Sequence, residues 1–175
     1  MYRRDLLKAV SVPVVAGATG ALSGWAHGTA AADRLPIAKG SRIVITSRPL
    51  MTVRIVAAPP QRLGTVPHGI RTIVPVTGGD FEGSRLRGKV LPGGADWLLL
   101  RGDGVLEFDL RITLETDDHA PIYMRFQGFR HGHYFRTLPA FETSTDRYAF
   151  LNRVITVGVG EGRPDGAVHR IDEIL

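Results

Sequence analysis

Three polar residues with the chemistry of a proton-transfer site alternate along one short segment. Asp109, Arg111 and Thr113 are separated by single apolar residues. In a β-strand, side chains at every second position share one face and lie about 6 to 7 Å apart. A carboxylate beside a guanidinium can act as a base, or the pair can bind a substrate carboxylate. We predict that Asp109 and Arg111 are catalytic and face a lumen; a solvated outer face with ion pairs is the alternative.

A histidine next to another arginine is the third predicted catalytic residue. His68 stands directly before Gly69 and close to Arg71. A loop histidine near a guanidinium can serve as a general base or as an anion ligand. The alternative is an exposed loop histidine with no special role.

Further polar and aromatic side chains are predicted to line a small-molecule pocket. Asp96 and Trp97 follow a Gly-Gly pair and enter an apolar run, where Trp97 would wall the pocket and Asp96 would point into it. Alternatively, Asp96 holds the turn by bonding to nearby backbone N–H groups. The predicted ligand-binding residues are Arg71, Asp96, Trp97, Tyr123, Tyr134, Glu142 and Asn152.

Metal and nucleophile chemistry have little support in the sequence. His131 and His133 would share one face of a strand, but the next acid, Glu142, lies nine residues further on and past a proline. The sequence has no cysteine, which excludes thiol catalysis, thiolate metal sites and disulfides. No G-x-S-x-G segment indicates a serine hydrolase. We predict neither a metal nor a cofactor.

The elements that must position these residues are β-strands. From Leu106 to Leu114, apolar side chains alternate with polar ones, as in a strand with two different faces. About nine strands are predicted in all: 42–46, 51–57, 71–77, 85–91, 97–101, 105–116, 122–129, 148–159 and 168–174.

Turn residues between these runs predict antiparallel pairing. Gly78-Gly79-Asp80, Pro92-Gly93-Gly94, Gly102-Asp103-Gly104 and Pro164-Asp165-Gly166 all suit turns. A closed barrel is favoured over a sandwich because closure removes exposed strand edges. We predict an all-β fold, a small antiparallel β-barrel resembling a lipocalin in general shape. Residues 131–146 are interpreted as a long loop over one barrel mouth, with room for a short helix.

The first 32 residues are interpreted as a targeting segment. Arg3 and Arg4 begin a run that resembles a twin-arginine signal, and a weakly apolar stretch follows. Ala30 and Ala32 give an A-x-A cleavage signature. Several Gly, Ser and Thr residues make this stretch unsuitable as a stable membrane anchor. We predict export by the twin-arginine machinery to the periplasm or the medium, leaving residues 33–175 as a single domain.

The charge of the remaining chain argues against nucleic acid as a partner. Removing Arg3, Arg4, Lys8 and Asp5 lowers the formal net charge from +5 to +3. The other arginines are interspersed with acids, and no basic block or basic stripe with aromatics occurs. The predicted partner is a small-molecule ligand, and a homo-oligomer is left open.

Several short runs together resemble the DUF3237 (UPF0311) family. They are Gly64–Arg71, Gly78–Gly83, Leu91–Trp97, Asp103-Gly104, Asp109–Arg111, Thr116–Asp118, Tyr134–Thr137 and Leu151–Arg153. The resemblance covers roughly residues 45–175 and implies a small antiparallel β-barrel; most members have no assigned activity. Where the family tends to have Asp-Asp-Gly, this chain has Asp117-Asp118-His119-Ala120-Pro121, so the resemblance leaves the turn geometry open there.

Three classes of function remain open. The first is a cofactor-free lyase or isomerase that binds a small aromatic or carboxylated compound, with Asp109 or His68 as base and Arg111 holding an anionic group. The second is a periplasmic binding or carrier protein that uses the same pocket without turnover. The third is a structural or assembly protein whose barrel is filled by its own side chains.

Overall fold

We describe the protein by a computed structural model, which covers residues 44–175. The predicted signal segment, residues 1–32, lies outside the described residues. The strands are β1 (Ser47–Ala57), β2 (Gln61–Val66), β3 (Gly69–Glu82), β4 (Arg87–Leu100), β5 (Leu106–Thr116), β6 (Pro121–His131), β7 (Tyr134–Glu142), β8 (Thr156–Arg163) and β9 (Gly166–Ile174). One 3₁₀ helix, η1 (Asp146–Arg153), lies between β7 and β8. Within the described part of the chain, no helix is long and apolar enough to span a bilayer.

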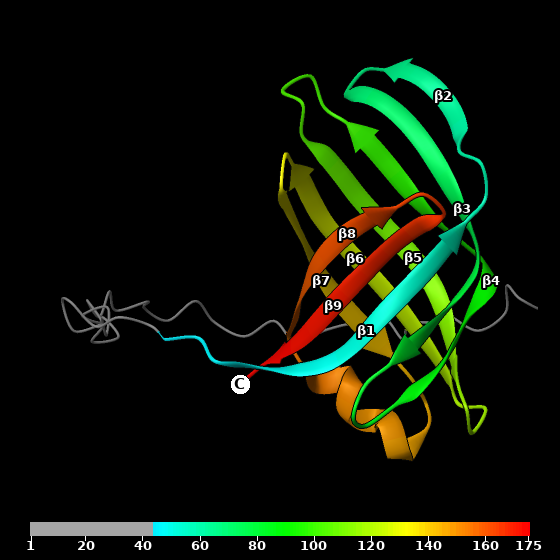
Figure 1. Cartoon of the computed structure of the whole chain (residues 1–175), viewed down its shortest axis with the longest axis vertical. Helices are drawn as coiled ribbons and strands as arrows, with labels where there is room; N and C mark the ends of the chain where they lie inside the picture. The colour runs from blue at the N-terminus through cyan, green and yellow to red at the C-terminus, as the bar shows by residue number, and fades with distance from the viewer. Residues whose placement is uncertain (1–43) are drawn as a thin grey trace, which may run out of the picture. The chain divides into compact units, whose positions relative to one another are not determined.

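The predicted antiparallel β-barrel is confirmed. The strands follow the order β1-β9-β8-β7-β6-β5-β4-β3-β2, and β1 also pairs with β3. This pairing joins Thr52–Ala57 to Val76–Glu82 and closes an eight-stranded barrel (Figure 1). The extra strand, β2, pairs with the other half of β3, from Gly69 to Ile73. Because β1 and β2 take different halves of β3, the barrel is closed around its lower part and flanked by β2 above.

Glycines that were interpreted as turns are bends inside long strands. Gly78 and Gly79 lie within β3 with φ of 156° and 138°, and a Cβ at Gly79 would overlap the Arg54 carbonyl oxygen of β1. Pro92-Gly93-Gly94 lies within β4, where the pairing with β5 shifts register between Leu91 and Ala95. The predicted strands 85–91 and 97–101 are therefore parts of one bulged strand. The other two predicted turns do connect strands.

The interpretation of residues 131–146 as a long loop is wrong. Gly132 and His133 form a tight turn, and β7 then pairs with β6 from His131↔Tyr134 to Tyr123↔Glu142. The predicted strand 148–159 is wrong in its first half, because Asp146–Arg153 is the 3₁₀ helix and β8 begins at Thr156. The sequence pattern also missed β2 and placed strand at 44–46, where the backbone is irregular.

The lower end of the barrel is closed by η1. Tyr148 and Leu151 are buried beneath the strands, 4% and 1% exposed. The Tyr148 hydroxyl donates a hydrogen bond to Asp118 Oδ1 at 2.8 Å, and Asp118 also pairs with Arg147 at 3.0 Å. The interior at this end is filled by fully buried side chains such as Leu114, Ile122 and Met124. Space for a ligand is therefore expected only toward the other end.

The turn where the family tends to have glycine keeps a glycine-like backbone. His119 has φ of 63°, and it is the non-glycine residue with positive φ among residues 44–175. Its N–H donates to the Thr116 carbonyl oxygen at 2.8 Å, which closes the turn between β5 and β6. His119 thus adopts a left-handed conformation that L-residues with a Cβ rarely take.

The seam between β7 and β8 is the least extensive pairing in the barrel wall. Only Arg136↔Val159 and Thr137↔Gly158 are paired there, whereas β8 and β9 pair from Thr156↔Glu173 to Arg163↔Gly166. Gly158 is required at this seam, because a Cβ would overlap the Thr137 hydroxyl. The β8–β9 hairpin is thus joined firmly to β1 and weakly to β7.

Candidate functional site

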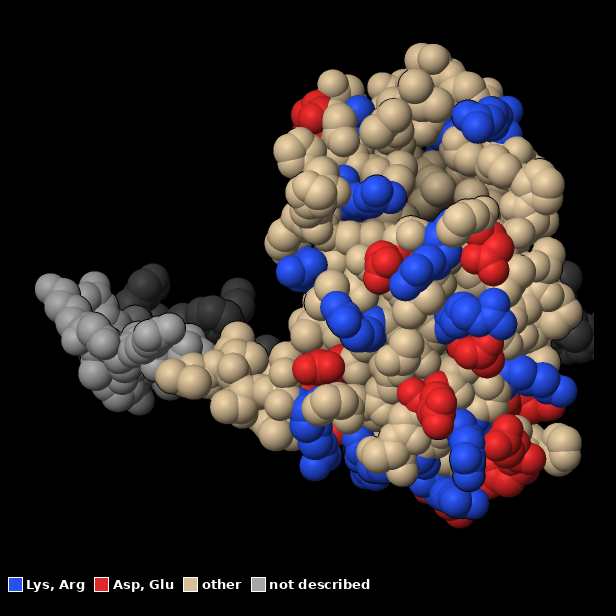
Figure 2. Space-filling view, in the orientation of Figure 1, with Lys and Arg blue, Asp and Glu red and all other residues tan. Residues whose placement is uncertain are grey.

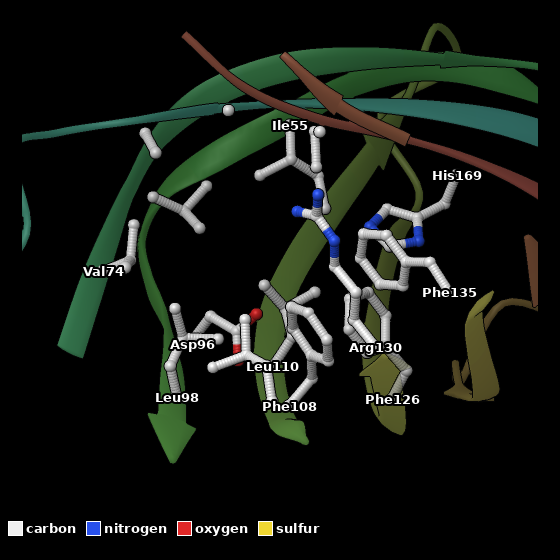
Figure 3. A pocket seen from close by; sticks show the side chains of 16 residues that line it. Ile55, Val74, Asp96, Leu98, Phe108, Leu110, Phe126, Arg130, Phe135 and His169 are labelled. Atoms are coloured by element: carbon white, nitrogen blue, oxygen red, sulfur yellow. The ribbon is translucent and has the colours of Figure 1, made fainter. Parts of the chain in front are cut away.

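A cavity of about 220 Å³ lies inside the upper half of the barrel (Figure 3). Its wall is mostly apolar and comes from all eight strands of the barrel, every strand except β2. The labelled apolar residues are Ile55, Val74, Leu98, Phe108, Leu110, Phe126 and Phe135. An apolar cavity of about 150 Å³ is enough to hold benzene, so this one can hold a substituted ring.

Three aromatic rings and a histidine form one side of the cavity. The rings of Phe108 and Phe135 are stacked, with centroids 4.6 Å apart and planes 15° apart. His169 lies 4.7 Å from Phe126 and meets Phe135 edge-on at 5.1 Å. Such a wall offers flat, rigid surfaces to a planar ligand.

Asp96 supplies a buried carboxyl group to the cavity. It lies on β4, is 9% exposed, and accepts a hydrogen bond from the Asp109 N–H at 3.1 Å. Burial raises its pKa to about 7, because the ionised form loses its hydration. The Asp109 hydrogen bond acts in the opposite direction and lowers the pKa. At neutral pH this carboxyl group exists in both protonation states, as a general acid or base requires.

His169 is a second buried titratable group in the same cavity. It lies on β9, is 1% exposed, and its Nδ1 has no hydrogen-bond partner among the described residues. Burial lowers the pKa of His169 to about 4, so the imidazole is neutral at physiological pH. A buried polar atom without a partner is costly.

Arg130 brings a positive charge to the cavity. Its guanidinium projects from β6 into the space between the Ile55 side and the aromatic wall (Figure 3). The ion pairs found within residues 44–175 do not include Arg130. Its guanidinium lies 5.9 Å from the centre of the Phe135 ring. Arg130 is exposed to solvent, so its guanidinium is available to an anionic ligand at the open side of the cavity.

The predicted catalytic pair lies on the outer surface instead of the lumen. Strand β5 turns Leu106, Phe108 and Leu110 toward the cavity, so Asp109 and Arg111 face outward. They pair with each other at 3.0 Å, and their side chains are 34% and 56% exposed. The expectation that this polar face lines the lumen is therefore wrong, because an eight-stranded barrel has a narrow interior that the apolar face of β5 fills.

Several other predicted residues gather with this pair in an outer hollow. Asp109, Arg71 and Trp97 line it, and the Arg111 guanidinium lies 5.6 Å from the centre of the Trp97 ring. Arg71 donates a hydrogen bond to the Trp97 carbonyl oxygen at 3.0 Å. Trp97 is 36% exposed and walls this hollow instead of the lumen. Of the predicted pocket residues, only Asp96 reaches the cavity.

The remaining predicted residues lie away from the cavity. His68 is exposed in the turn between β2 and β3. Tyr134 is 57% exposed and lies beneath the Arg136 guanidinium. Tyr123, Glu142 and Asn152 line a second, open hollow on the outer surface. Asn152 has a structural role there, since its side chain bonds the backbone N–H and carbonyl of Thr143, both at 2.8 Å.

Sequence reasoning missed Arg130 and His169, although a signal for both was present. His169 is in phase with Ile171 on β9, and Arg130 is in phase with Met124 and Phe126 on β6. A titratable residue at a position that alternation assigns to the apolar face is a candidate for the interior. Among residues 44–175, no group of three or more potential metal ligands comes together.

The sequence of this chain matches a known protein family. A model of the family described as "Protein of unknown function (DUF3237)" matches residues 45–134 and 131–174. The chain belongs to the DUF3237 family. A UPF0311 protein of Rhodopseudomonas palustris (strain TIE-1) is 32% identical over 130 residues, which cover 64% of this chain and 85% of the relative.

Two solved structures place this DUF3237 chain among known folds. A beta-barrel like protein from Acinetobacter baumannii AYE is 33% identical, with a TM-score of 0.74 over 78% of this chain and 99% of that one. A protein described as an enzyme from Penicillium herquei is 22% identical, with a TM-score of 0.66 over 78% of this chain and 99% of that one. At that identity the second likeness concerns the fold alone.

Proposed function

We propose that the barrel binds a small organic anion with an aromatic ring in its lumen and catalyses a proton transfer on it. The observation that carries this proposal is the buried carboxyl group of Asp96, whose pKa of about 7 suits proton transfer at neutral pH. Arg130, which lines the same cavity, supplies the positive charge for the anion. The stacked rings of Phe108 and Phe135 favour a planar ligand.

The chemistry that fits these groups is an isomerisation or elimination at a carbon next to a carbonyl. The ionised Asp96 takes a proton from that carbon, and the C–H electron pair becomes a C=C bond. The carbonyl oxygen then carries the negative charge, which the Arg130 guanidinium stabilises. Protonated Asp96 returns the proton at another atom, or a leaving group departs with its electron pair.

Phenylpyruvate is a suitable test compound, because it combines a ring, a carboxylate and an acidic C–H bond. We expect the protein to bind it and to accelerate exchange of its benzylic protons with D₂O, followed by NMR. Asp96→Asn should lower the protein-dependent exchange rate by about 10² to 10⁴ fold. Phenylpyruvate affinity should change by less than about threefold, since the amide keeps the shape of the side chain.

Asp109→Asn is the matched comparison, since it removes a carboxylate from the outer face of the neighbouring strand. We expect that variant to exchange phenylpyruvate protons at close to the wild-type rate. If Asp109→Asn greatly lowered the exchange rate and Asp96→Asn did not, the reaction would take place in the outer hollow instead of the cavity. Tight binding without exchange in the wild type would assign the barrel as a carrier, and no binding of phenylpyruvate, benzoate or 4-methylphenol would refute the ligand pocket.

We also propose that the protein is exported through the twin-arginine pathway before it acts. This proposal is supported by Arg3-Arg4, the weakly apolar stretch behind them and the Ala30–Ala32 cleavage signature. The double substitution Arg3→Lys and Arg4→Lys should retain the uncleaved precursor inside the cell. The wild-type protein should instead appear outside the inner membrane, with the mass of residues 33–175. Equal distribution of the two proteins would refute this route.

A further inference from the structure

The inner face of the barrel continues beyond the cavity as an uncovered apolar wall. Ile70 of β3 pairs with Leu100 of β4, Leu100 pairs with Leu106 of β5, and Leu106 pairs with Arg130 of β6. Directly paired residues share one face of a sheet. Leu106 and Arg130 line the cavity, so Ile70 and Leu100 lie on that same inner face. We call Ile70, Leu100 and Leu106 the rim wall.

The rim wall is apolar and open to solvent. Ile70 is 46% exposed and Leu100 is 39% exposed, although both are on the concave side of the sheet. Strand β1, which completes the barrel wall lower down, pairs with β3 only from Val76 to Glu82. Figure 2 shows a hollow in the upper half of this view whose floor is uncharged and whose margins carry Lys or Arg side chains, whereas charged side chains of both signs are more numerous in the lower half.

Strand β4 connects the rim wall to the part of the cavity that contains Asp96. Asp96, Leu98 and Leu100 alternate along the inner face of β4, and Asp96 is directly paired with Val74 and Leu110 at the deeper level. Four residues of strand span about 13 Å, which is roughly the length of a phenol ring with a tail of five or six carbons. The cavity itself has room for the ring but little more.

We propose that the ligand has a second, apolar part, a tail that leaves the lumen and lies on the rim wall. The ligand class is then an amphipathic arene, with its polar head at Asp96 and an alkyl or similar tail over Leu98, Leu100 and Ile70. This inference rests on the proposed function for the position of the head. Its particular support is that the wall is continuous with the cavity through Leu98 and Leu106, which line it.

A homologous series of 4-alkylphenols, from 4-methylphenol to 4-heptylphenol, tests the tail directly by calorimetric titration. A fully buried methylene improves affinity about fourfold, so a wall that covers one side of the tail should give about twofold per carbon. The gain should level off near pentyl or hexyl, where the tail passes Leu100. The doubly substituted variant Ile70→Thr with Leu100→Thr should remove most of this dependence and leave 4-methylphenol affinity within about twofold.

Leu138→Thr is the control, because Leu138 is 63% exposed on the outer face of β7. It should leave the chain-length dependence unchanged, and thermal unfolding should confirm that each variant is folded. If 4-methylphenol binds but affinity does not rise with tail length, the rim wall is refuted and the pocket stands. If the dependence survives in the double variant, the tail lies elsewhere. If no member of the series binds, the wall is refuted, and phenylpyruvate decides the pocket separately.

A second copy of the chain is the competing occupant of the rim wall. Sedimentation velocity would then find a dimer that Ile70→Thr dissociates, and that result would overturn the inference. A monomer at all concentrations used in the titrations, together with the twofold dependence on tail length, is the expected outcome.

Discussion

The backbone N–H of Asp109 donates a hydrogen bond to Oδ1 of Asp96, with the two atoms 3.1 Å apart. The Asp109 side chain faces outward and pairs with Arg111, so one residue connects the outer surface to the buried carboxyl group. This hydrogen bond favours the ionised form of Asp96, while burial favours the protonated form more strongly. The balance places the pKa of Asp96 at about 7.

The rate of proton exchange should depend on the ionisation of Asp96. Below its pKa of about 7, kcat/KM for phenylpyruvate exchange should rise about tenfold per pH unit and become constant above about pH 8. The measurement is the exchange rate by NMR between pH 5 and 9, corrected for exchange without protein. A profile with a midpoint near 4 would show that the base is an exposed carboxylate instead.

Stability should have little pH dependence from the two buried groups between about pH 4.5 and 6.5, because their contributions oppose each other. The folded protein keeps the Asp96 proton, whose pKa is raised to about 7, and leaves His169 neutral, whose pKa is lowered to about 4. The unfolded chain has the reverse, an ionised Asp96 and a protonated His169. Folding therefore changes the proton count of this pair by nearly zero.

Single substitutions should reveal the two opposing slopes. In Asp96→Asn, His169 is the member of the pair that still titrates, and the unfolded chain binds its proton while the folded protein does not. The free energy of unfolding should therefore rise with pH by up to about 1.4 kcal/mol per pH unit between 4.5 and 6.5. In His169→Gln, only Asp96 remains, and the free energy of unfolding should fall by a similar amount per unit up to about pH 7. Urea unfolding at several pH values measures both, and parallel profiles in the two variants would contradict this account.

Arg130 should be required for binding an anion but not for binding a neutral ring. Arg130→Gln should weaken phenylpyruvate binding by about 10 to 100 fold, since a hydrogen bond to a charged group contributes about 1.5 to 3 kcal/mol. The same variant should bind 4-methylphenol with nearly unchanged affinity. Arg125→Gln removes an exposed arginine from the outer face of the same strand and should affect neither ligand.

A methyl group at Gly160 should disturb the aromatic wall. A Cβ there would lie 2.7 Å from three atoms of the Phe135 ring, which stacks on Phe108. Gly160→Ala should therefore destabilise the protein by about 1 to 3 kcal/mol, as overpacking does, and should weaken ligand binding. Gly102→Ala, at a site with no atom within 4 Å of the added carbon, should change the free energy of unfolding by less than about 0.5 kcal/mol.

Replacing His119 by glycine should stabilise the turn between β5 and β6. His119 has φ of 63°, and glycine adopts this conformation without the strain that a Cβ causes. The expected gain is about 0.5 to 1 kcal/mol in urea unfolding. Only an exposed contact with Glu115 at 3.6 Å is lost, which contributes little. His119→Ala keeps the Cβ and should give no such gain.

The barrel was predictable from the sequence because alternation and turn residues both indicate it. The strand from Leu106 to Thr116 and the turn at Gly102-Asp103-Gly104 lie where they were predicted. Glycines gave the main errors, because Gly78-Gly79 and Pro92-Gly93-Gly94 allow either a turn or a bend inside a strand. Which of these occurs is decided by the close approach of a neighbouring strand, such as β1 at Gly79, and that contact is not local in sequence.

The site was less predictable than the fold, because alternation separates two faces without saying which residues meet across the lumen. Asp96 was expected to point into a pocket, and it does line the cavity. Arg130 and His169, which line the same cavity, come from β6 and β9, far from Asp96 along the chain. The prediction placed Asp109 and Arg111 in the lumen because their face of β5 carries several charged side chains. A mostly apolar face with a single ionisable residue is more often the one that is buried.

The short pairing between β7 and β8 lies in the wall of the cavity of about 220 Å³. The hairpin of β8 and β9 carries Gly162, Ala167 and His169 of the cavity wall. The backbone pairing that holds it to β7 is limited to Arg136 and Thr137, and the Thr156 hydroxyl of β8 adds a hydrogen bond to the Pro139 carbonyl oxygen of β7 at 2.6 Å. We therefore expect a ligand bulkier than the cavity to part the wall at this seam, because opening here breaks the fewest backbone hydrogen bonds between strands.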